Sequence, residues 1–321
     1  MALLSIRELS VEYRTERGPL RAVDTVSLDL KEGETLGLAG ESGCGKSTLA
    51  FSILRLLPPS ARISGRIELD GENVVDMDDR TLRNYRWKSV SLVPQGSMNA
   101  FDPVRTIGSQ IVEGIKAHES ISKAEAWQRA RKLLSSVGIS EDRAKSFPFQ
   151  FSGGMRQRAA IAMALSLNPK LVILDEPTTA LDVVVQKQIL TLLRHLQREY
   201  QTSFIFITHD LSVLADIATR IAVMYAGKIA EIGSETEVLG SPQHPYSRAL
   251  IAAIPTIDGE KSAAKSIPGL PPDLISPPSG CRFHPRCPFV FEKCINVEPA
   301  LTQISRETQA ACHLLKAWEA K

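Results

Sequence analysis

The sequence lacks long apolar runs. It has 321 residues, and its most apolar stretch, residues 159–174, is broken by Asn168, Pro169 and Lys170. Because a helix needs about 20 consecutive apolar residues to cross a bilayer, we expect no membrane-spanning helix. The N-terminus also reaches Arg7 and Glu8 before an apolar core of the signal-peptide type forms. These features predict a protein that stays in the cytosol.

The sequence also has little net charge and few cysteines. The 38 Lys and Arg residues nearly balance the 36 Asp and Glu residues, for a net charge of +2. No global field therefore attracts the chain to nucleic acid or to an anionic membrane. Five cysteines are too few for a disulfide framework in a chain of this length. With 43% hydrophobic and 23% charged residues, the composition excludes disordered, collagen-like and coiled-coil proteins.

The chain is long enough for two domains. Its first 240 or so residues alternate short apolar runs with helical patterns, which is typical of an α/β fold with a mostly parallel sheet covered by helices. We expect strands at residues 36–39, 90–93, 171–174, 204–207 and 221–225, and helices near 47–57, 123–137, 154–167 and 184–200. Prolines are frequent from residue 242 to 288 and exclude long helices and central strands there. We therefore predict a domain at residues 1–240 and an ordered, proline-rich extension at 241–321.

A glycine-rich segment follows the first predicted buried strand. Residues 40–48 read GESGCGKST and precede a helical pattern, which is the context of a Walker A phosphate-binding loop. The glycines allow backbone N–H groups to face a β-phosphate, Lys46 can reach the β- and γ-oxygens, and Ser47 can bind Mg²⁺. We expect Cys44 to be a small buried residue with no catalytic role. The predicted nucleotide contacts of this loop are Gly40, Ser42, Gly43, Cys44, Gly45, Lys46, Ser47 and Thr48.

A second apolar run ends in two carboxylates. Residues 171–176 read LVILDE, so a buried strand would deliver Asp175 to its C-terminal end, where the carboxylate can hold a Mg²⁺-bound water. The adjacent Glu176 can orient and deprotonate the water that attacks a γ-phosphate. Together with the Walker A loop, this pair predicts nucleotide hydrolysis.

A third motif begins another helix. Ser152, Gly153 and Gly154 form a second helix start that can bind an anion. The simplest explanation for two such sites in one chain is a head-to-tail dimer, in which the second site of each chain covers the nucleotide held by its partner.

With these three motifs in this order, the sequence resembles the ATP-binding subunits of ABC transporters over essentially the whole chain. Residues 152–154 match the signature motif of that family, with Phe151 in place of the usual Leu and Met155 where Gln is commonest. The resemblance implies an α/β P-loop NTPase fold with a mixed-sheet core and a helical subdomain at about residues 96–165. It also implies that the protein is an ATPase coupled to transport.

The resemblance assigns further residues. It places Gln95 in the Q-loop near Mg²⁺, residues 180–182 in the D-loop, and His209 as the switch histidine at the γ-phosphate. Tyr13 stands where the family stacks an aromatic ring on adenine. The implied catalytic residues are Glu176, His209 and Lys46; the implied Mg²⁺ contacts are Ser47, Gln95 and Asp175; and Ser152, Gly153 and Gly154 are implied to bind ATP.

Four of the five cysteines lie in the extension, at Cys281, Cys287, Cys294 and Cys312. Four thiolates can form a soft site suited to an iron–sulfur cluster or to Zn²⁺. The spacings of 5, 6 and 17 intervening residues differ from the C-x-x-C pairs of zinc ribbons and favour iron. Two histidines nearby, at positions 284 and 313, keep a mixed zinc site open.

The extension indicates which group of ABC transporters the sequence resembles. Residues 241–250 (SPQHPYSRAL) and 267–272 (IPGLPP) resemble the C-terminal extension of ATPases from importers of the peptide/nickel/opine type. This implies that the four cysteines bind a [4Fe–4S] cluster. It also implies a peripheral protein on the cytoplasmic face of the cell membrane, which powers peptide uptake when ATP closes its dimer.

The implied partners are a second ATPase subunit (the same chain or a related one), two membrane-spanning permease subunits and an external substrate-binding protein, with no nucleic acid. We expect the permeases to dock on the segment after Gln95, through exposed Met98 and Phe101.

Several alternatives stay open from the sequence. The cargo could be an oligosaccharide, nickel or an opine instead of a peptide. A non-transport ABC ATPase acting on DNA or ribosomes would normally carry two cassettes in one chain or a long coiled-coil insertion, and neither is visible. A nucleic-acid-binding module in the extension would need a basic, aromatic-rich patch around the cysteines. The residues available for such a patch are Arg282, Phe283, Arg286, Phe289, Phe291 and Lys293.

Overall fold

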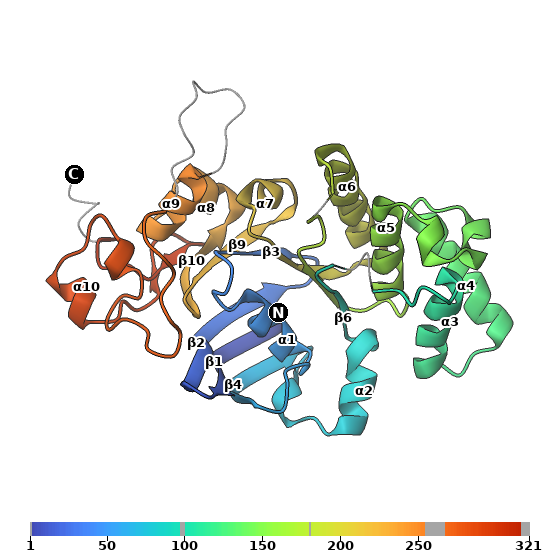
Figure 1. Ribbon diagram of the computed structural model, residues 1–321, viewed down its shortest axis with the longest axis horizontal. Helices are drawn as coiled ribbons and strands as arrows, with labels where there is room; N and C mark the ends of the chain where they lie inside the picture. Colours follow the sequence, from blue (N-terminus) through green and yellow to red (C-terminus); the bar gives the residue numbers. More distant parts are fainter. Residues whose placement is uncertain (1, 97–99, 180, 254–266, 316–321) are drawn as a thin grey trace. The chain divides into compact units, whose positions relative to one another are not determined.

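The computed structural model describes residues 2–96, 100–179, 181–253 and 267–315. The chain divides into two compact units. Figure 1 labels their helices and strands. The first unit comprises residues 31–33 and 76–207, and the second comprises residues 2–30, 34–75 and 208 onward. Within the described residues, no helix is both long and apolar enough to span a bilayer.

The second unit contains an antiparallel sheet that the sequence did not lead us to expect. Its strand order is β2–β1–β4–β5, with β1 at Ala2–Thr15, β2 at Gly18–Lys31, β4 at Ala61–Leu69 and β5 at Glu72–Asn73. The pairing of β1 with β4 shifts register between Arg7 and Ser10, and Glu8 has a φ of 49°. Such a bulge moves the buried side chains from one phase of the alternation to the other. The resulting break in the pattern hid β1 from a reading by periodicity.

A second sheet in the same unit is mixed, as predicted. Its order is β11–β12–β10–β9–β3, with β3 at Thr35–Ala39, β9 at Arg220–Tyr225, β10 at Lys228–Ser234, β11 at Thr302–Gln303 and β12 at Gln309–Ala310. β3 and β9 are parallel, whereas β10 is antiparallel to both β9 and β12. Within its described residues, the proline-rich extension contributes two short strands at the edge of this sheet, in agreement with the expectation from its prolines.

Short helices complete the second unit. They are α1 at Lys46–Ile53, α7 at Leu211–Ile217, α8 at Glu235–Gly240, α9 at Pro245–Ala252, the 3₁₀ turn His284–Arg286 and α10 at Glu292–Asn296, with another 3₁₀ turn, Val74–Asp76, at the border between the units. A buried carboxylate sets the start of α9, because Glu231 of β10 accepts the N–H groups of Gln243 and His244 at 2.8 and 2.9 Å. Burial raises the pKa of Glu231.

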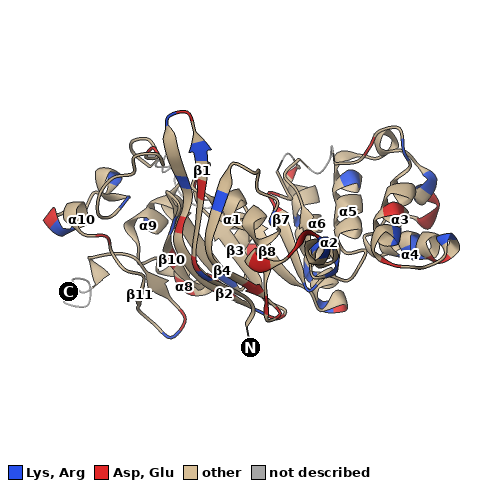
Figure 2. Cartoon of the chain, turned by 90° about the horizontal axis from the view of Figure 1, so that it is seen from below, with Lys and Arg blue, Asp and Glu red and all other residues tan. Residues whose placement is uncertain are grey.

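In the part of the first unit that the structure describes, there are three parallel strands and five α-helices. The strands β6 at Val90–Val93, β7 at Leu171–Asp175 and β8 at Ser203–Ile207 pair in the order β6–β7–β8. The helices are α2 at Asp79–Lys88, α3 at Ile107–His118, α4 at Lys123–Ser136, α5 at Gly153–Ala164 and α6 at Val183–Tyr200, with 3₁₀ turns at Glu141–Lys145 and Pro148–Gln150. The predicted strands and helices of this unit are confirmed, while α2 and α3 were not predicted. Figure 2 shows basic and acidic residues interspersed along α3 and α4.

We predict that the stability of the first unit depends on its buried strands. Val172 in β7 is 1% exposed, whereas Val184 in α6 is 68% exposed. Val172→Ala removes two buried methyl groups and leaves a cavity, so it should lower the free energy of unfolding by about 2 kcal/mol. The matched change Val184→Ala should stay within about 0.5 kcal/mol of the parent protein. Urea unfolding followed by circular dichroism measures both, and equal shifts of the midpoint would contradict the assigned burial.

Candidate functional site

The predicted phosphate-binding loop lies in the second unit, between β3 and α1. Two of its glycines have positive φ angles and stand against backbone. A Cβ at Gly40 (φ 144°) would lie 2.3 Å from the carbonyl oxygen of Met224, and one at Gly45 (φ 108°) would lie 2.2 Å from that of Ala22. Only glycine can occupy these positions without a shift of the backbone. The loop is therefore held tightly between β9 and β2.

Lys46 begins α1 and points back over this loop. Its side chain is buried, and its Nζ donates to the carbonyl oxygens of Gly40 and Glu41 at 2.7 and 2.9 Å. The sulfur of Cys44 lies 3.7 Å from the same Nζ. Cys44 is buried, as predicted, and burial raises the pKa of its thiol. The arrangement holds an ammonium group among carbonyl oxygens, where anionic phosphate oxygens can replace them.

Other predicted nucleotide contacts lie beside this loop. The hydroxyl of Tyr13 in β1 donates to Oγ1 of Thr48 in α1 at 3.3 Å, so the structure brings these two predicted residues together. Ser47 is half-buried next to them, while Ser42 and Gly43 are exposed. His209 also belongs to the second unit and is exposed immediately before α7.

The predicted hydrolytic residues lie in the first unit, at the C-terminal end of β7. Asp175 is 2% exposed, and the half-buried Glu176 follows it with a φ of 48°. The carboxylate of Glu176 accepts hydrogen bonds from Nε2 of Gln95 at 3.0 Å and from Oγ1 of Thr179 at 3.1 Å. The structure thus brings Gln95 and Glu176 together. The sequence alone did not predict this contact. These two donors orient the carboxylate.

The predicted signature residues also lie in the first unit. Ser152 is the N-cap of α5, and its Oγ accepts the N–H of Met155 at 3.3 Å. A Cβ at Gly154 would come within 2.8 Å of Val185 in α6, so this glycine also permits close packing of the two helices. Gly153 is the first residue of α5. The helix start therefore combines an exposed cap with a packing constraint.

The segment after Gln95 differs from the prediction. Met98 lies outside the described residues, and Phe101 is 5% exposed, so the expectation of an exposed Phe101 is wrong. Gln110 of α3 explains the difference, since it accepts the N–H of Asp102 at 2.9 Å and donates to the carbonyl oxygen of Asp102 at 3.1 Å. These bonds hold the segment against α3 and turn the ring of Phe101 inward. The exposed apolar residue here is Val104, at 79%.

The four cysteines of the extension line one small cavity in the second unit. Burial raises the pKa of the Cys281 and Cys312 thiols to about 11, and it also raises the pKa of Cys287. All the cysteines are free thiols. Among the residues that the structure describes, no group of three or more His, Cys, Asp or Glu side chains is arranged to hold a metal ion.

Backbone N–H groups surround the thiols of this cavity. Three cysteines accept a backbone hydrogen bond from the residue two positions further on, and this contact favours the thiolate. The pairs are Cys281 with Phe283, Cys287 with Phe289, and Cys312 with Leu314.

Three of the six residues named above for a nucleic-acid patch are unavailable, whereas Phe289, Phe291 and Lys293 are exposed. Arg282 pairs with Asp24 and donates to the carbonyl oxygen of Ala226, and Arg286 pairs with Glu41. Phe283 is 2% exposed. The side chains of Arg282, Phe283 and Arg286, used in this way, cannot contact phosphates or stack on bases.

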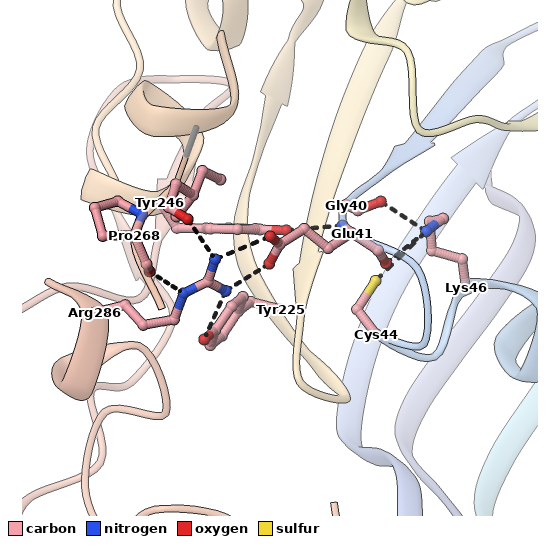
Figure 3. Close-up of polar contacts among 9 residues, drawn as sticks. Gly40, Glu41, Cys44, Lys46, Tyr225, Tyr246, Pro268 and Arg286 are labelled. Carbon is pink, nitrogen blue, oxygen red and sulfur yellow. Dashed lines mark hydrogen bonds and ion pairs between the residues drawn. The ribbon is translucent and has the colours of Figure 1, made fainter. Parts of the chain in front are cut away.

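Sequence reasoning missed two residues of the extension that contact the phosphate-binding loop. The guanidinium of Arg286 forms two hydrogen bonds with the carboxylate of Glu41, and the hydroxyl of Tyr246 accepts the Glu41 N–H (Figure 3). The hydrogen bonds to Glu41 raise the pKa of Arg286, and burial raises that of Tyr246. Arg286 lies 245 positions from Glu41 in the sequence, and no local pattern signals the contact.

Comparisons with known proteins agree with these features. The family model described as ABC transporter matches residues 23–179, and the model described as oligopeptide/dipeptide transporter, C-terminal region, matches residues 230–294. The oligopeptide transport ATP-binding protein OppD of Salmonella typhimurium is 44% identical over 92% of this chain and 89% of its own length. The dipeptide transport ATP-binding protein DppD of Bacillus subtilis is 45% identical over 97% of this chain and 94% of its own length.

The fold agrees as well. The dimeric bacterial ABC transporter cassette MJ0796 is similar with a TM-score of 0.65 and 29% identity, over 72% of this chain and 98% of that one. The same cassette is also known in a post-hydrolysis state bound to ADP and phosphate, with the same TM-score. The chain therefore belongs to the ATP-hydrolysing, ATP-binding proteins of ABC transporters, in the group that carries the oligopeptide/dipeptide transporter C-terminal region.

Proposed function

We propose that this chain is the ATP-hydrolysing subunit of an importer of dipeptides and oligopeptides, bound to membrane permeases on the cytoplasmic face. The observation that carries the proposal is the presence on one chain of both the ABC core, at residues 23–179, and the oligopeptide/dipeptide C-terminal region, at 230–294. The relatives that match nearly the whole chain are named for oligopeptide and dipeptide transport. The extension thus supports peptide cargo over the other solutes of this importer class.

The proposed chemistry uses ATP and Mg²⁺, which are general to ABC ATPases. Lys46 already lies among carbonyl oxygens, so its ammonium group is placed to bind the β- and γ-phosphate oxygens. Ser47, Gln95 and Asp175 would hold Mg²⁺, which neutralises charge on the phosphates when bound. His209 would contact the γ-phosphate, and Tyr13 would stack on adenine. The loop residues 40–48 would supply the remaining phosphate contacts.

Glu176 is the proposed general base. Its carboxylate is oriented by hydrogen bonds from Gln95 and Thr179, and a carboxylate held in this way can accept the proton of an attacking water. Because Gln95 donates to this carboxylate, a movement of Gln95 would change the orientation of the base. The contact thus joins the segment after β6 to the proposed general base of hydrolysis.

The proposed assembly is a head-to-tail dimer on two permeases, fed by an external substrate-binding protein. The helix start Ser152–Gly153–Gly154, in which Ser152 is exposed, would cover the nucleotide of a partner ATPase, which is either a second copy or a related chain. ATP held between two subunits stabilises the closed state, and hydrolysis removes that stabilisation. Transport follows because the permeases respond to closure and reopening.

The catalytic proposal predicts the effect of Glu176→Gln. The amide keeps the shape of the side chain and cannot accept the proton, so the rate of ATP hydrolysis should fall at least about 100-fold. Binding of a fluorescent ATP analogue should persist in the same variant. Lys46→Ala is the contrasting change and should weaken nucleotide binding itself. Hydrolysis by the Gln variant at the parent rate would remove Glu176 from the mechanism.

Transport is tested in the host cell. Deletion of the gene should abolish uptake of a radiolabelled tripeptide, and expression of the wild-type chain should restore it. Lys46→Ala should not restore uptake, since the ammonium group that binds the phosphates is missing. Arg17→Ala, which removes only an exposed ion pair with Asp273, should restore it fully. Normal peptide uptake in the deletion strain would contradict the proposed cargo.

We also propose that the four extension cysteines hold a [4Fe–4S] cluster with a structural role. Their thiols line one cavity, and three of the sulfurs accept backbone N–H bonds, as sulfurs of such clusters do. Zinc would need all four sulfurs about 2.3 Å from one centre, whereas the four irons of a cluster spread the thiolates over a larger volume. The two sites therefore differ in their metal and sulfide content, which chemical analysis can distinguish.

Metal analysis tests this proposal. Protein purified without oxygen should contain about four irons and matching sulfide per chain. Cys287→Ser should lower the iron content sharply, because it removes one of the four thiolates. Cys44→Ser is the matched control, since Cys44 lies in the phosphate-binding loop, and it should keep its iron. One zinc per chain, or no metal at all, would contradict the cluster.

A further inference from the structure

The phosphate-binding loop has an outer contact that the function proposed above does not use. Three groups converge on a single loop residue, Glu41 (Figure 3). Its carboxylate pairs with Arg286, its N–H donates to Tyr246, and its carbonyl oxygen accepts the ammonium of Lys46. Glu41 therefore joins two side chains of the extension to the lysine that reaches the phosphates.

The contact with Arg286 is bidentate and joins a buried guanidinium to a half-buried carboxylate. The Arg286 side chain is 4% exposed, and its two terminal nitrogens donate to the two carboxylate oxygens of Glu41 at 2.7 and 3.0 Å. Nε donates to the carbonyl oxygen of Pro268 at 2.8 Å, and the guanidinium lies over the ring of Tyr225. A bidentate pair of this kind fixes both distance and direction.

The contact with Tyr246 is equally well supported. Tyr246 is fully buried in α9, and its hydroxyl lies 2.8 Å from the backbone nitrogen of Glu41. Its ring packs against Tyr225 and against Phe283, which lies between the first two cysteines of the extension. The hydroxyl therefore has little freedom to follow a displaced loop.

We propose that Arg286 and Tyr246 of the extension position the phosphate-binding loop through Glu41, so that the affinity for ATP depends on the extension. Arg286 and Tyr246 touch no substrate and act as positioning residues. When ATP binds, its phosphates must draw Lys46 away from the carbonyl oxygens of Gly40 and Glu41. A loop held by Arg286 and Tyr246 keeps its shape when these internal hydrogen bonds break. Without that support, the nucleotide would have to order the loop itself, and the free-energy cost of this ordering would lower the affinity for ATP.

This inference rests on the proposed role of Lys46 in nucleotide binding, and the experiment separates the two. Dissociation constants are measured for a fluorescent ATP analogue with Mg²⁺, using the full chain and its variants. Lys46→Ala tests the proposed function, and Arg286→Ala tests the inference. We expect Arg286→Ala to raise the dissociation constant about tenfold or more, and Arg286→Lys to recover only part of the loss because lysine cannot bind a carboxylate in the bidentate form.

A double-mutant cycle tests the partner. If Arg286 acts through Glu41, the variant Glu41→Ala with Arg286→Ala should bind ATP no more weakly than Arg286→Ala alone. Tyr246→Phe removes only the hydroxyl and should weaken binding several-fold by itself. Turnover at saturating ATP should change by less than about twofold in Arg286→Ala, since the hydrolytic residues are untouched. Additive losses in the cycle would overturn the assigned pathway.

Arg282→Ala provides the matched control. Arg282 also joins the extension to the rest of the unit, with a side chain 9% exposed that pairs with Asp24, and it makes no bond to Glu41. It should lower the melting temperature and leave ATP affinity within about twofold of the parent. An equal loss of affinity in the Arg282 and Arg286 variants would show general loosening and overturn the proposal. Unchanged affinity in Arg286→Ala, with binding lost in Lys46→Ala, would overturn the inference and leave the proposed function standing.

Discussion

The second unit is built around one ammonium group that is almost fully removed from water. Lys46 is 6% exposed, and a buried charge is costly unless polar groups surround it. The carbonyl oxygens of Gly40 and Glu41 provide that surrounding. To turn them inward, the backbone must adopt left-handed angles and approach its neighbours closely, which explains the glycines at positions 40 and 45. The same carbonyls are weaker partners than phosphate oxygens, so the loop is stable alone and can still exchange them for a nucleotide.

Buried charge also explains why the extension packs as part of this unit. Three acidic residues outside the extension, Asp24, Glu41 and Glu231, receive their partners from it. Arg282 pairs with Asp24, Arg286 pairs with Glu41, and the backbone at 243 and 244 donates to Glu231. Asp24 also pairs with Lys228, whereas removal of Arg286 would leave the half-buried carboxylate of Glu41 without its bidentate donor, which is destabilising. The core strands and the extension therefore stabilise each other, although their sequences have very different composition.

The sequence was most informative where structure and chemistry are local. The strands β3, β6, β7, β8 and β9 are continuous apolar runs and were predicted within a residue or two, because strands buried on both faces need no alternation. The loop at 40–48 and the carboxylates at the end of β7 follow from motifs whose spacing is set by the chemistry of phosphate and Mg²⁺. By contrast, β1 was missed because its alternation changes phase at the bulge around Glu8. Exposure of Phe101 was predicted wrongly because the side chain of Gln110, a residue of a helix that was not predicted, determines the direction of that segment.

The contacts of the extension could not have been predicted in this way. Arg282 and Arg286 stand in a run of basic and aromatic residues that suggested an exposed patch, and nothing in that run shows that both side chains turn inward. The choice of an ion-pair partner depends on which surfaces meet in the folded chain, and Glu41 is 245 residues away from Arg286. Motifs thus identify where a nucleotide can bind, because the residues within each motif are contiguous in the chain. They do not identify what holds those residues in place, because any rigid neighbour can supply that support. In this fold the rigid neighbour is the extension. Only the folded structure shows that its residues Arg286 and Tyr246 contact the phosphate-binding loop.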